Sequence, residues 1–376
     1  MLFMPIIVLF YKNNGLSMQD IFTLKAAYSI AIVLLEIPSG YIADVLGRKK
    51  TLIIGAFLGF AGFLIYDFSF NFWGFLMAEL VLGIGQSLIS GADSALLYDS
   101  LKKMNKENKY LRYEGKMTAI GNFAEAAAGI IGGLLAEISL RTPFYTQTAV
   151  AFIAIPAALT LIEPVRYQKI SRMRFINILG IVKYTLFKSH ALKWHIIFSA
   201  VIGTSTLTMA WFVQPYFEKV ELKLALFGVF WALLNLSVAI TSYYAHKVEF
   251  KFGPKNLILF IAITLPGLYL IISQIDIIWG ISILFVFYLV RGIATPILKD
   301  YINKLTDSNI RATVLSVRNF LIRIVFAGVG PFLGWYTDHY TSSQALLLSG
   351  VVFILAALII SAFLLKKINI NISSQQ

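Results

Sequence analysis

The sequence predicts an all-α protein that crosses a membrane many times and is built as two related bundles of six helices. Hydrophobic residues make up 58% of the 376 positions and charged residues only 14%, whereas a soluble globular chain has roughly 25% charged residues. The apolar residues fall into blocks of about 20, the length that a helix needs to cross a bilayer. The longest polar interruption, residues 163–193, divides these blocks into two equal groups. Lipid is therefore the expected solvent for most of the chain.

The apolar blocks predict twelve membrane spans. They are residues 2–11, 19–42, 51–68, 72–98, 113–138, 143–162, 194–217, 224–247, 256–275, 277–299, 311–337 and 343–365. The first block has about ten residues, roughly 15 Å of helix, which is too short to cross the bilayer. We expect either a true start site upstream of Met1 or a truncated first helix.

Lysine and arginine lie mostly in alternate loops, which predicts the orientation of the chain. If the N-terminus is inside, the outer loops hold only Lys12, Arg141, Lys219 and Lys223, and most of the 32 basic residues lie in cytoplasmic loops or close to them. This is the bias of the positive-inside rule. It predicts a multi-pass protein of the inner, or cytoplasmic, membrane with both termini in the cytoplasm. It also accounts for the net charge of +13 without nucleic-acid binding.

The polar interruption predicts the domain boundary. We expect an N-terminal bundle over residues 1–162, a cytoplasmic linker over 163–193 and a C-terminal bundle over 194–376. Basic residues of the linker accompany an apolar series at helical spacing, formed by Phe175, Leu179, Val182 and Leu186. This pattern predicts an amphipathic helix on an anionic inner leaflet. A solvated linker is the alternative.

Short internal similarities relate the two halves. Residues 80–84 in the fourth span resemble residues 289–293 in the tenth, and residues 128–130 in the fifth resemble 327–329 in the eleventh. Many transporters are assembled from such repeats, with a binding site between them. The glycines of the fifth span, Gly129, Gly132 and Gly133, predict close contact with another helix, with a bend as the alternative.

One loop motif carries most of the functional information. Between the second and third spans the chain reads Gly40-Tyr41-Ile42-Ala43-Asp44-Val45-Leu46-Gly47-Arg48-Lys49-Lys50. A carboxylate at a helix end, a glycine that permits a tight turn and a cationic cluster at the membrane surface can together form a latch that holds another helix terminus. An ordinary basic loop is the alternative.

This loop resembles the signature G-x-x-x-D-x-x-G-R-K-K of the major facilitator superfamily, in the position that the family requires. The resemblance implies the major facilitator fold and a transporter whose two bundles rock about a central cavity. It implies a conformational latch that closes the cytoplasmic side, formed by Gly40, Asp44, Gly47, Arg48 and Lys49. Asp44 is then expected near residues 311–313, and Arg48 near Asp99 or, as a second candidate, Asp93. The corresponding loop of the second half keeps Gly253 and Lys255 but lacks the Asp-Gly-Arg core.

Two carboxylates inside the spans are candidates for coupling transport to protons. An ionisable group in hydrocarbon costs several kcal/mol unless it is paired, protonated or facing water. Glu79 lies roughly 10 Å from the outer end of its span, and Glu125 about 19 Å into its own. Burial favours the protonated carboxyl, so either residue could load and unload a proton. The alternative for Glu79 is a hydrogen bond to a neighbouring helix. Exporters that resemble this chain often have arginine where Glu79 stands.

Further residues are assigned to contacts between the halves and to the cavity. Glu36 and Arg318 lie at matched depths on the second and eleventh spans, which the family fold places against each other, so they are expected to form an interdomain pair. The deep cations Arg291 and Arg323 are candidates for binding an anionic group, with snorkelling or local pairing as the alternative. The substrate-cavity candidates are Gln86, Trp211, Gln214, Asn235 and Arg291. Packing and interfacial anchoring are the alternatives for the Trp and Gln residues.

An enzyme is the rival class, and the sequence argues against it. Catalysis would need a nucleophile, a base or metal ligands gathered at one depth, and the chain has four histidines and no cysteine. No nucleotide-binding loop of the form G-x-x-x-x-G-K occurs. We therefore expect no catalytic residues, no metal and no cofactor.

The expected function is secondary active transport of a small molecule by a monomeric protein. Without a nucleotide site, a proton gradient is the expected driving force. The resemblance to multidrug-type exporters implies outward transport by alternating access. Two alternatives stay open: a proton-coupled importer of a small organic solute, and a non-transporting sensor or scaffold of transporter ancestry.

Overall fold

The structure is a computed structural model, and it is helical almost throughout. It describes residues 1–376 except for Gly91 and residues 107–108, 164–179, 181–182, 184, 186–188, 307–309 and 374–376. The described residues contain helices and turns and no strand, which confirms the predicted all-α class. The predicted amphipathic linker helix lies almost entirely outside the described residues. The side chains of a few helical residues, among them Asp44, are also outside the description.

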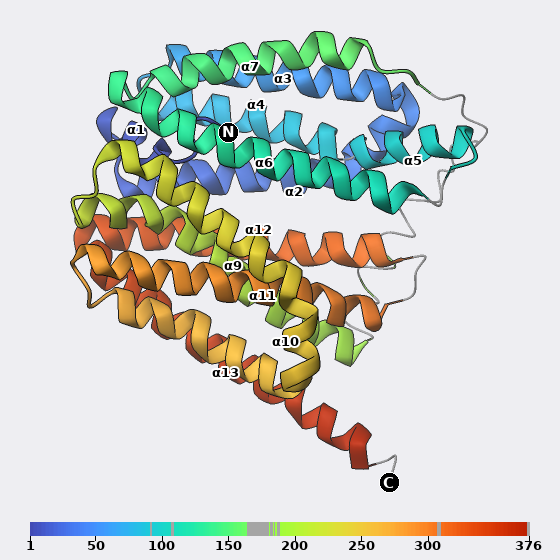
Figure 1. Ribbon diagram of the computed structural model, residues 1–376, viewed down its shortest axis with the longest axis vertical. Helices are drawn as coiled ribbons and strands as arrows, with labels where there is room; N and C mark the ends of the chain where they lie inside the picture. The colour runs from blue at the N-terminus through green and yellow to red at the C-terminus, as the bar shows by residue number, and fades with distance from the viewer. Residues whose placement is uncertain are drawn as a thin grey trace. The chain divides into compact units, whose positions relative to one another are not determined.

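The chain forms two compact units (Figure 1). The first comprises Met1–Ser171 together with Lys223–Ala232, and the second comprises Arg172–Leu222 and Leu233–Gln376. Helices of the first unit are α1 (Ile7–Asn13), α2 (Met18–Leu46), α3 (Arg48–Phe68), α4 (Phe72–Ser90), α5 (Asp93–Lys103), α6 (Tyr110–Ile138) and α7 (Thr142–Leu159).

Local sequence explains where several of these helices begin. Ser17 and Asp20 form a capping box at the start of α2, in which the Asp20 N–H donates to Ser17 Oγ (3.1 Å) and the Ser17 N–H donates to Asp20 Oδ2 (3.1 Å). The span predicted at residues 72–98 is two helices, α4 and α5. Asp93 opens α5, and its carboxylate accepts a hydrogen bond from the Ser94 N–H (2.6 Å). An acidic side chain at this position favours a new helix start.

Long apolar helices also form the second unit. They are α9 (His190–Lys219), α10 (Leu224–Ile272), the short 3₁₀ turn η3 (Ile278–Gly280), α11 (Ile281–Lys304), α12 (Arg311–His339) and α13 (Ser342–Ser373). The 49 residues of α10 would extend about 74 Å as one straight helix, more than twice the hydrocarbon thickness. Gly253 interrupts it with φ 71° and ψ 161°. The two spans predicted at residues 224–247 and 256–275 therefore lie on either side of this break.

The first residues of α10 pack in the first unit, against α6. A Cβ atom added to Gly228 would lie 2.2 Å from the Gly129 carbonyl oxygen, and one added to Gly133 would lie 2.9 Å from the Gly228 nitrogen. Only glycine permits backbones to approach so closely. Gly132 is equally crowded, because its added Cβ would lie 1.7 Å from the Leu2 carbonyl oxygen. The glycines of the fifth span thus make close backbone contacts.

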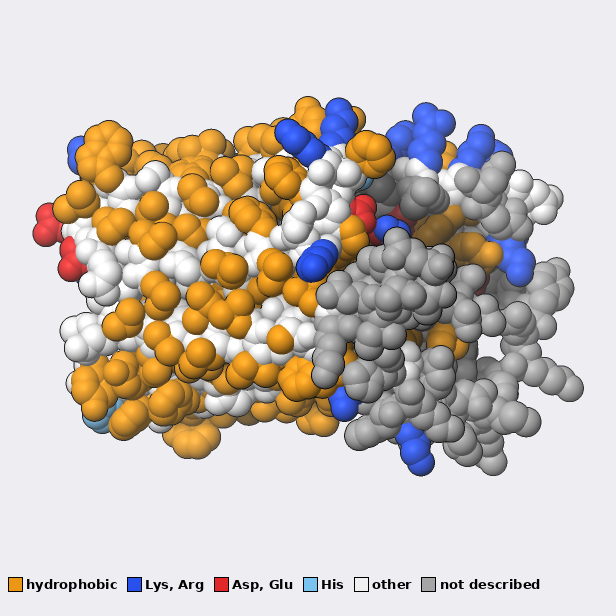
Figure 2. All heavy atoms as spheres, turned by 90° about the horizontal axis from the view of Figure 1, so that it is seen from below, with side chains coloured by type: hydrophobic (Ala, Val, Ile, Leu, Met, Phe, Trp, Pro, Cys, Tyr) orange, Lys and Arg blue, Asp and Glu red, His pale blue; other side chains and the backbone are white. Residues whose placement is uncertain are grey.

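The surface of the molecule is apolar over large areas. On the face drawn in Figure 2, apolar side chains cover much of the described part, and lysine and arginine gather toward one end. Large apolar side chains are widely exposed on the helices, as at Phe123 (79%) and Leu34 (68%). Nine of the described helical stretches are long and apolar enough to cross a membrane, with α10 counted once. These side chains fit a hydrocarbon environment.

Candidate functional site

The turn between α2 and α3 depends on Gly47. This residue ends α2 and precedes Arg48, the first residue of α3. Its φ of 104° and ψ of 142° lie in a region that side chains with a Cβ rarely adopt. Gly40, by contrast, is uncrowded, because an added Cβ would meet nothing within 4 Å. The structure therefore explains the glycine at position 47 and gives no steric reason for the one at position 40.

Arg48 ties α3 to α5. Its Nη1 atom lies 2.5 Å from Asp99 Oδ2, and the same nitrogen donates to the Ala95 carbonyl oxygen. Both side chains of the ion pair are partly exposed, so solvent screens their attraction. Of the two acids expected near Arg48, the structure thus places Asp99 in contact with it. Asp93 instead accepts the hydrogen bond at the start of α5.

Glu163 completes this site, and the sequence analysis missed it. Its carboxylate accepts hydrogen bonds from the backbone N–H groups of Arg48 (3.0 Å) and Lys49 (2.6 Å). An acid there satisfies otherwise unpaired donors at the N-terminus of α3 and interacts favourably with the helix dipole. A Cβ on Gly47 would lie 3.3 Å from Glu163 Oε2. The usable signal was an acid directly after the sixth span, facing a helix whose own N-cap position is glycine.

The partner of Asp44 stays a prediction. Its side chain lies outside the described residues, and so does that of Ala312 within the expected partner segment, residues 311–313.

We name the cluster of Gly47, Arg48, Asp99 and Glu163 the inner latch.

The second half also has an ion pair close to a glycine with a positive φ. Gly253 adopts a positive φ like Gly47, and a helix start follows each of them. Glu249 lies four residues before Gly253, and its Oε1 atom is 3.3 Å from Nζ of Lys304 at the end of α11. Lys304 also pairs with Asp300 (2.7 Å). An ion pair therefore joins the residues before the Gly253 break to the end of α11, although the Asp-Gly-Arg letters are missing there.

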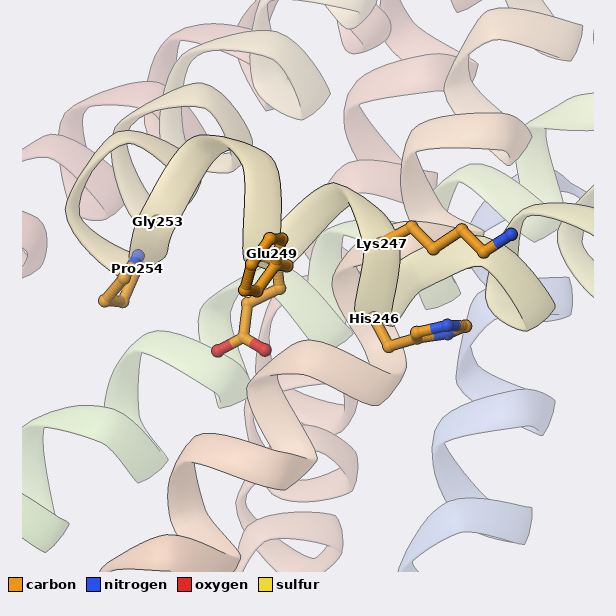
Figure 3. Close-up of a pocket in the computed structure, with 6 residues that line it drawn as sticks. His246, Lys247, Glu249, Gly253 and Pro254 are labelled. Atoms are coloured by element: carbon orange, nitrogen blue, oxygen red, sulfur yellow. The ribbon is translucent and has the colours of Figure 1, made fainter.

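An open pocket of about 580 Å³ lies at this break in α10. It is lined by His246, Lys247, Glu249, Phe250, Gly253 and Pro254. Figure 3 shows the Glu249 carboxylate pointing away from the broken helix, toward the helices beneath it. The pocket is open to the surface, so we do not assign it to a substrate.

Glu79 lies in a buried polar cluster that joins α1, α2, α3 and α4. Its Oε1 atom forms an ion pair with Lys25 Nζ and accepts hydrogen bonds from the hydroxyls of Tyr11 (2.8 Å) and Tyr66. Lys25 Nζ also donates to the Tyr11 hydroxyl (3.3 Å). Glu79 is 3% exposed and Lys25 6%. Glu79 therefore bonds to three side chains of its own unit and does not face open water. We name these four residues the outer cluster.

An aromatic shell encloses the outer cluster. The rings that surround Tyr11 and Tyr66 belong to Phe3, Phe10, Phe63, Phe75 and Phe144. Phe10 and Phe144 are the closest pair, with ring centroids 4.1 Å apart. All five are buried, so the ion pair lies where water cannot screen it.

The two coupling candidates thus have different environments. Glu125 lies on the exposed side of α6, whereas Glu79 is enclosed. A carboxylate near the middle of a membrane span cannot stay exposed to hydrocarbon at low cost. Which of the two carboxylates carries a proton stays a prediction.

The residues of the expected interdomain pair belong to different units. Arg318, 5% exposed, donates from Nε to Ser199 Oγ (2.5 Å) and from Nη1 to Asn319 Oδ1 (3.1 Å). Glu36 is partly buried in the first unit. Their pairing stays a prediction.

The cavity candidates differ in exposure. Gln86 is exposed on α4 in the first unit. In the second unit Gln214 is buried, and Trp211, Asn235 and Arg291 are partly exposed. The guanidinium carbon of Arg291 lies 5.2 Å from the centroid of the Tyr288 ring. Within the described chain, no group of three or more His, Asp and Glu side chains is placed to hold a metal ion.

Comparison with known proteins identifies the family. Residues 1–327 match the family model described as Major Facilitator Superfamily. The quinolone resistance protein NorA of Staphylococcus aureus is 22% identical over 337 residues, which cover 85% of this chain and 83% of the relative. Among solved structures, the nucleoside transporter NupG has a TM-score of 0.79 at 17% identity, covering 96% of this chain and 93% of its own. A D-xylose-proton symporter has a TM-score of 0.72 at 15% identity, covering 93% and 89%. This chain therefore belongs to the Major Facilitator Superfamily and is a membrane transporter, not an enzyme.

Proposed function

We propose that the protein is a proton-driven exporter of small organic molecules that works by alternating access. The inner latch carries this proposal. An ion pair, a glycine turn and a capped helix start at one end of the first unit form a contact that can be made in one conformation and released in another. The name of the Staphylococcus aureus relative describes quinolone resistance, which supports outward transport.

We place the protein in the cytoplasmic membrane as a monomer with both termini inside. The distribution of Lys and Arg supports this orientation. The basic side chains at that surface would lie among anionic lipid headgroups.

Uptake into proteoliposomes tests the function. The purified protein is reconstituted, a pH gradient of either polarity is imposed, and a quinolone such as norfloxacin is offered together with unrelated dyes. The proposal expects at least one compound to accumulate in the vesicles only when the gradient drives protons out of them. Accumulation with the proton gradient would favour an importer, and movement of no compound would favour a sensor or scaffold.

Protons are proposed as the driving ion, with Glu125 as their carrier. Among the described residues of the second unit, carboxylates stand only near helix ends, in loops or at the break in α10. Deep carboxylates are therefore confined to the first unit. There, Glu79 is held by an ion pair with Lys25 and by two tyrosine hydroxyls, whereas Glu125 is exposed. The name of one fold neighbour, a D-xylose-proton symporter, supports the proton as coupling ion.

Glu125→Gln is expected to abolish gradient-driven transport and to spare exchange of the transported compound between the two sides. Exchange needs only the conformational cycle with cargo bound, whereas net transport needs release of the proton. Glu137→Gln, an exposed acid near the end of the same helix, is the matched control and should behave like the unmodified protein. Unchanged pH dependence in Glu125→Gln would place the carrier elsewhere.

The pair Glu36–Arg318 is proposed to stabilise the state in which the cytoplasmic halves are closed. Glu36→Gln and Arg318→Gln should each shift the population toward the inward-open form, because either change removes the same contact. The two effects should not add. Accessibility of cysteines introduced on the cytoplasmic side measures the shift. Additive effects in the double variant would rule the pair out.

A further inference from the structure

The interior of the second unit is positively charged. Its spans carry Arg291, Arg318 and Arg323 at depth, and no carboxylate lies at a comparable depth. Asp307 lies outside the described residues, and the other acids of this unit are Glu218, Glu221, Glu249, Asp276, Asp300 and Asp338. All of them lie at helix ends, in loops or beside the Gly253 break. The first unit, by contrast, has Glu36 and Glu125 within its spans in addition to the paired Glu79.

Arg291 is too deep to reach either membrane surface. It lies ten residues after the start of α11 at Ile281 and thirteen before its end at Lys304, which is about 15 Å and about 20 Å of helix. Lysine and arginine near a helix end can extend their charge to the headgroups, but a guanidinium at the middle of a span cannot. Its charge must meet water, a counter-ion or a ligand inside the protein.

Arg291 has no carboxylate partner among the residues that the structure describes. Its guanidinium lies over the face of the buried Tyr288 ring, 5.2 Å from the centroid. No ion pair joins it to a carboxylate of the described residues, and the side chain is partly exposed. The guanidinium also interacts with the Tyr288 hydroxyl, but it has five N–H donors, and contact with one tyrosine engages only some of them. The remaining N–H donors of the guanidinium are thus available to an oxyanion.

Arg323 on α12 resembles Arg291 in its depth and in its partial exposure. It lies twelve residues after Arg311 and sixteen before His339, is partly exposed, and forms no ion pair among the described side chains. Arg318 differs, because it is buried and hydrogen-bonded to Ser199 and Asn319. Two mid-depth arginines therefore present unpaired charge, and one is already engaged.

We infer that the cargo of this transporter is an organic anion and that Arg291 binds its negatively charged group. An arginine fork binds carboxylate, sulfonate or phosphate oxygens through paired, charge-assisted hydrogen bonds. Arg323 supplies a second positive charge to the same unit. The inference rests on the proposed transport function and adds the substrate class to it. It also assigns cargo binding to the second unit and proton binding to the first.

Binding to the purified full chain in detergent tests the inference without any gradient. The probes share one ring system and differ in the head group: 1-naphthoate, naphthalene-1-sulfonate and 1-naphthyl phosphate, against neutral 1-naphthamide and cationic 1-naphthylmethylamine. Thermal stabilisation as a function of probe concentration gives the affinities. We expect at least one anionic probe to bind tenfold or more tightly than the amide and the amine. The order among the three anions identifies which oxyanion is preferred.

Arg291→Gln should remove this preference, and Arg291→Lys should restore part of it, because the charge returns without the fork. Lys251→Gln, an exposed cation near the break in α10, is the control and should leave every affinity unchanged. The ranking in the unmodified protein does not depend on any variant folding. Equal or tighter binding of the amine, binding of no anion, or an unchanged preference in Arg291→Gln would overturn the inference. If anions bind as expected but no compound is transported, the result would count against the proposed function and not against this inference.

Discussion

Replacement of Glu79 by Gln is expected to lower the stability of the protein by about 3–5 kcal/mol, the cost of leaving one charge of a buried pair uncompensated. Lys25 would lose its carboxylate partner at a buried site enclosed by aromatic rings, while its hydrogen bond to the Tyr11 hydroxyl would remain. Lys25→Met should cost a similar amount, because Glu79 would then keep only the two tyrosine hydroxyls. Unfolding of each variant in detergent micelles measures the loss.

The double variant Lys25→Met/Glu79→Gln should recover much of this stability, since no uncompensated charge remains. The matched control is the partly exposed pair of Lys304 and Asp300, which is separated by one helical turn. Removal of this control pair should lower the free energy of unfolding by only about 0.3–0.5 kcal/mol. Single and double losses at the outer cluster that simply add would show that the two charges do not interact.

Arg48→Ala and Asp99→Asn are each expected to reduce transport tenfold or more while leaving the protein folded and inserted. Each change removes the ion pair between α3 and α5 and weakens one conformational state more than the other. Asp44→Asn should have the same effect if the aspartate holds the eleventh span, as the family resemblance implies. Lys50→Ala, an exposed cation of the same loop, is the control and should transport normally.

The latch variants should also change the exposure of the cytoplasmic side. The chain has no cysteine, so single cysteines can be introduced into an unreactive background and labelled with a maleimide. Their labelling should rise in Arg48→Ala and stay unchanged in Lys50→Ala. Transport at the normal rate by all three latch variants would remove the loop from the mechanism.

Much of the fold was predictable because lipid imposes a simple rule on sequence. Each span needs about 20 apolar residues, so hydropathy places the helices, and the positive-inside rule orients them. Predicted and observed helices differ where local chemistry decides. Asp93 starts a new helix within a continuous apolar block, and Gly253 breaks α10 at a position where the letters of the latch motif are missing.

The candidate sites were less predictable, because their contacts join residues far apart in the chain. Glu163 lies more than a hundred residues from the helix start that it caps, and no local pattern links the two. Lys25 and Glu79 are 54 residues apart. Each lies seven residues from the beginning of its helix, so matched depth was the available signal. The same signal predicted the pair Glu36–Arg318 but was not applied to Lys25, so Glu79 was predicted either to carry a proton or to hydrogen-bond to a neighbouring helix.

The ion pair of Glu249 and Lys304 shows that a search for the residues of a motif can miss a charged contact. A latch requires opposite charges at two places, whichever place carries the acid. In the first unit Arg48, directly after Gly47, pairs with Asp99, and in the second unit Glu249, four residues before Gly253, pairs with Lys304. A search for the Asp-Gly-Arg core finds the first and misses the second.

The most direct test of the proposed function is proton movement caused by cargo in the absence of an imposed pH gradient. Proteoliposomes are loaded with a pH-sensitive dye, and norfloxacin or the naphthalene anion that binds most tightly is added outside. Antiport predicts that the lumenal pH rises as cargo enters, that a protonophore cancels the change, and that Glu125→Gln shows none. Entry of cargo with no change in lumenal pH, or with acidification of the lumen, would contradict proton-coupled export.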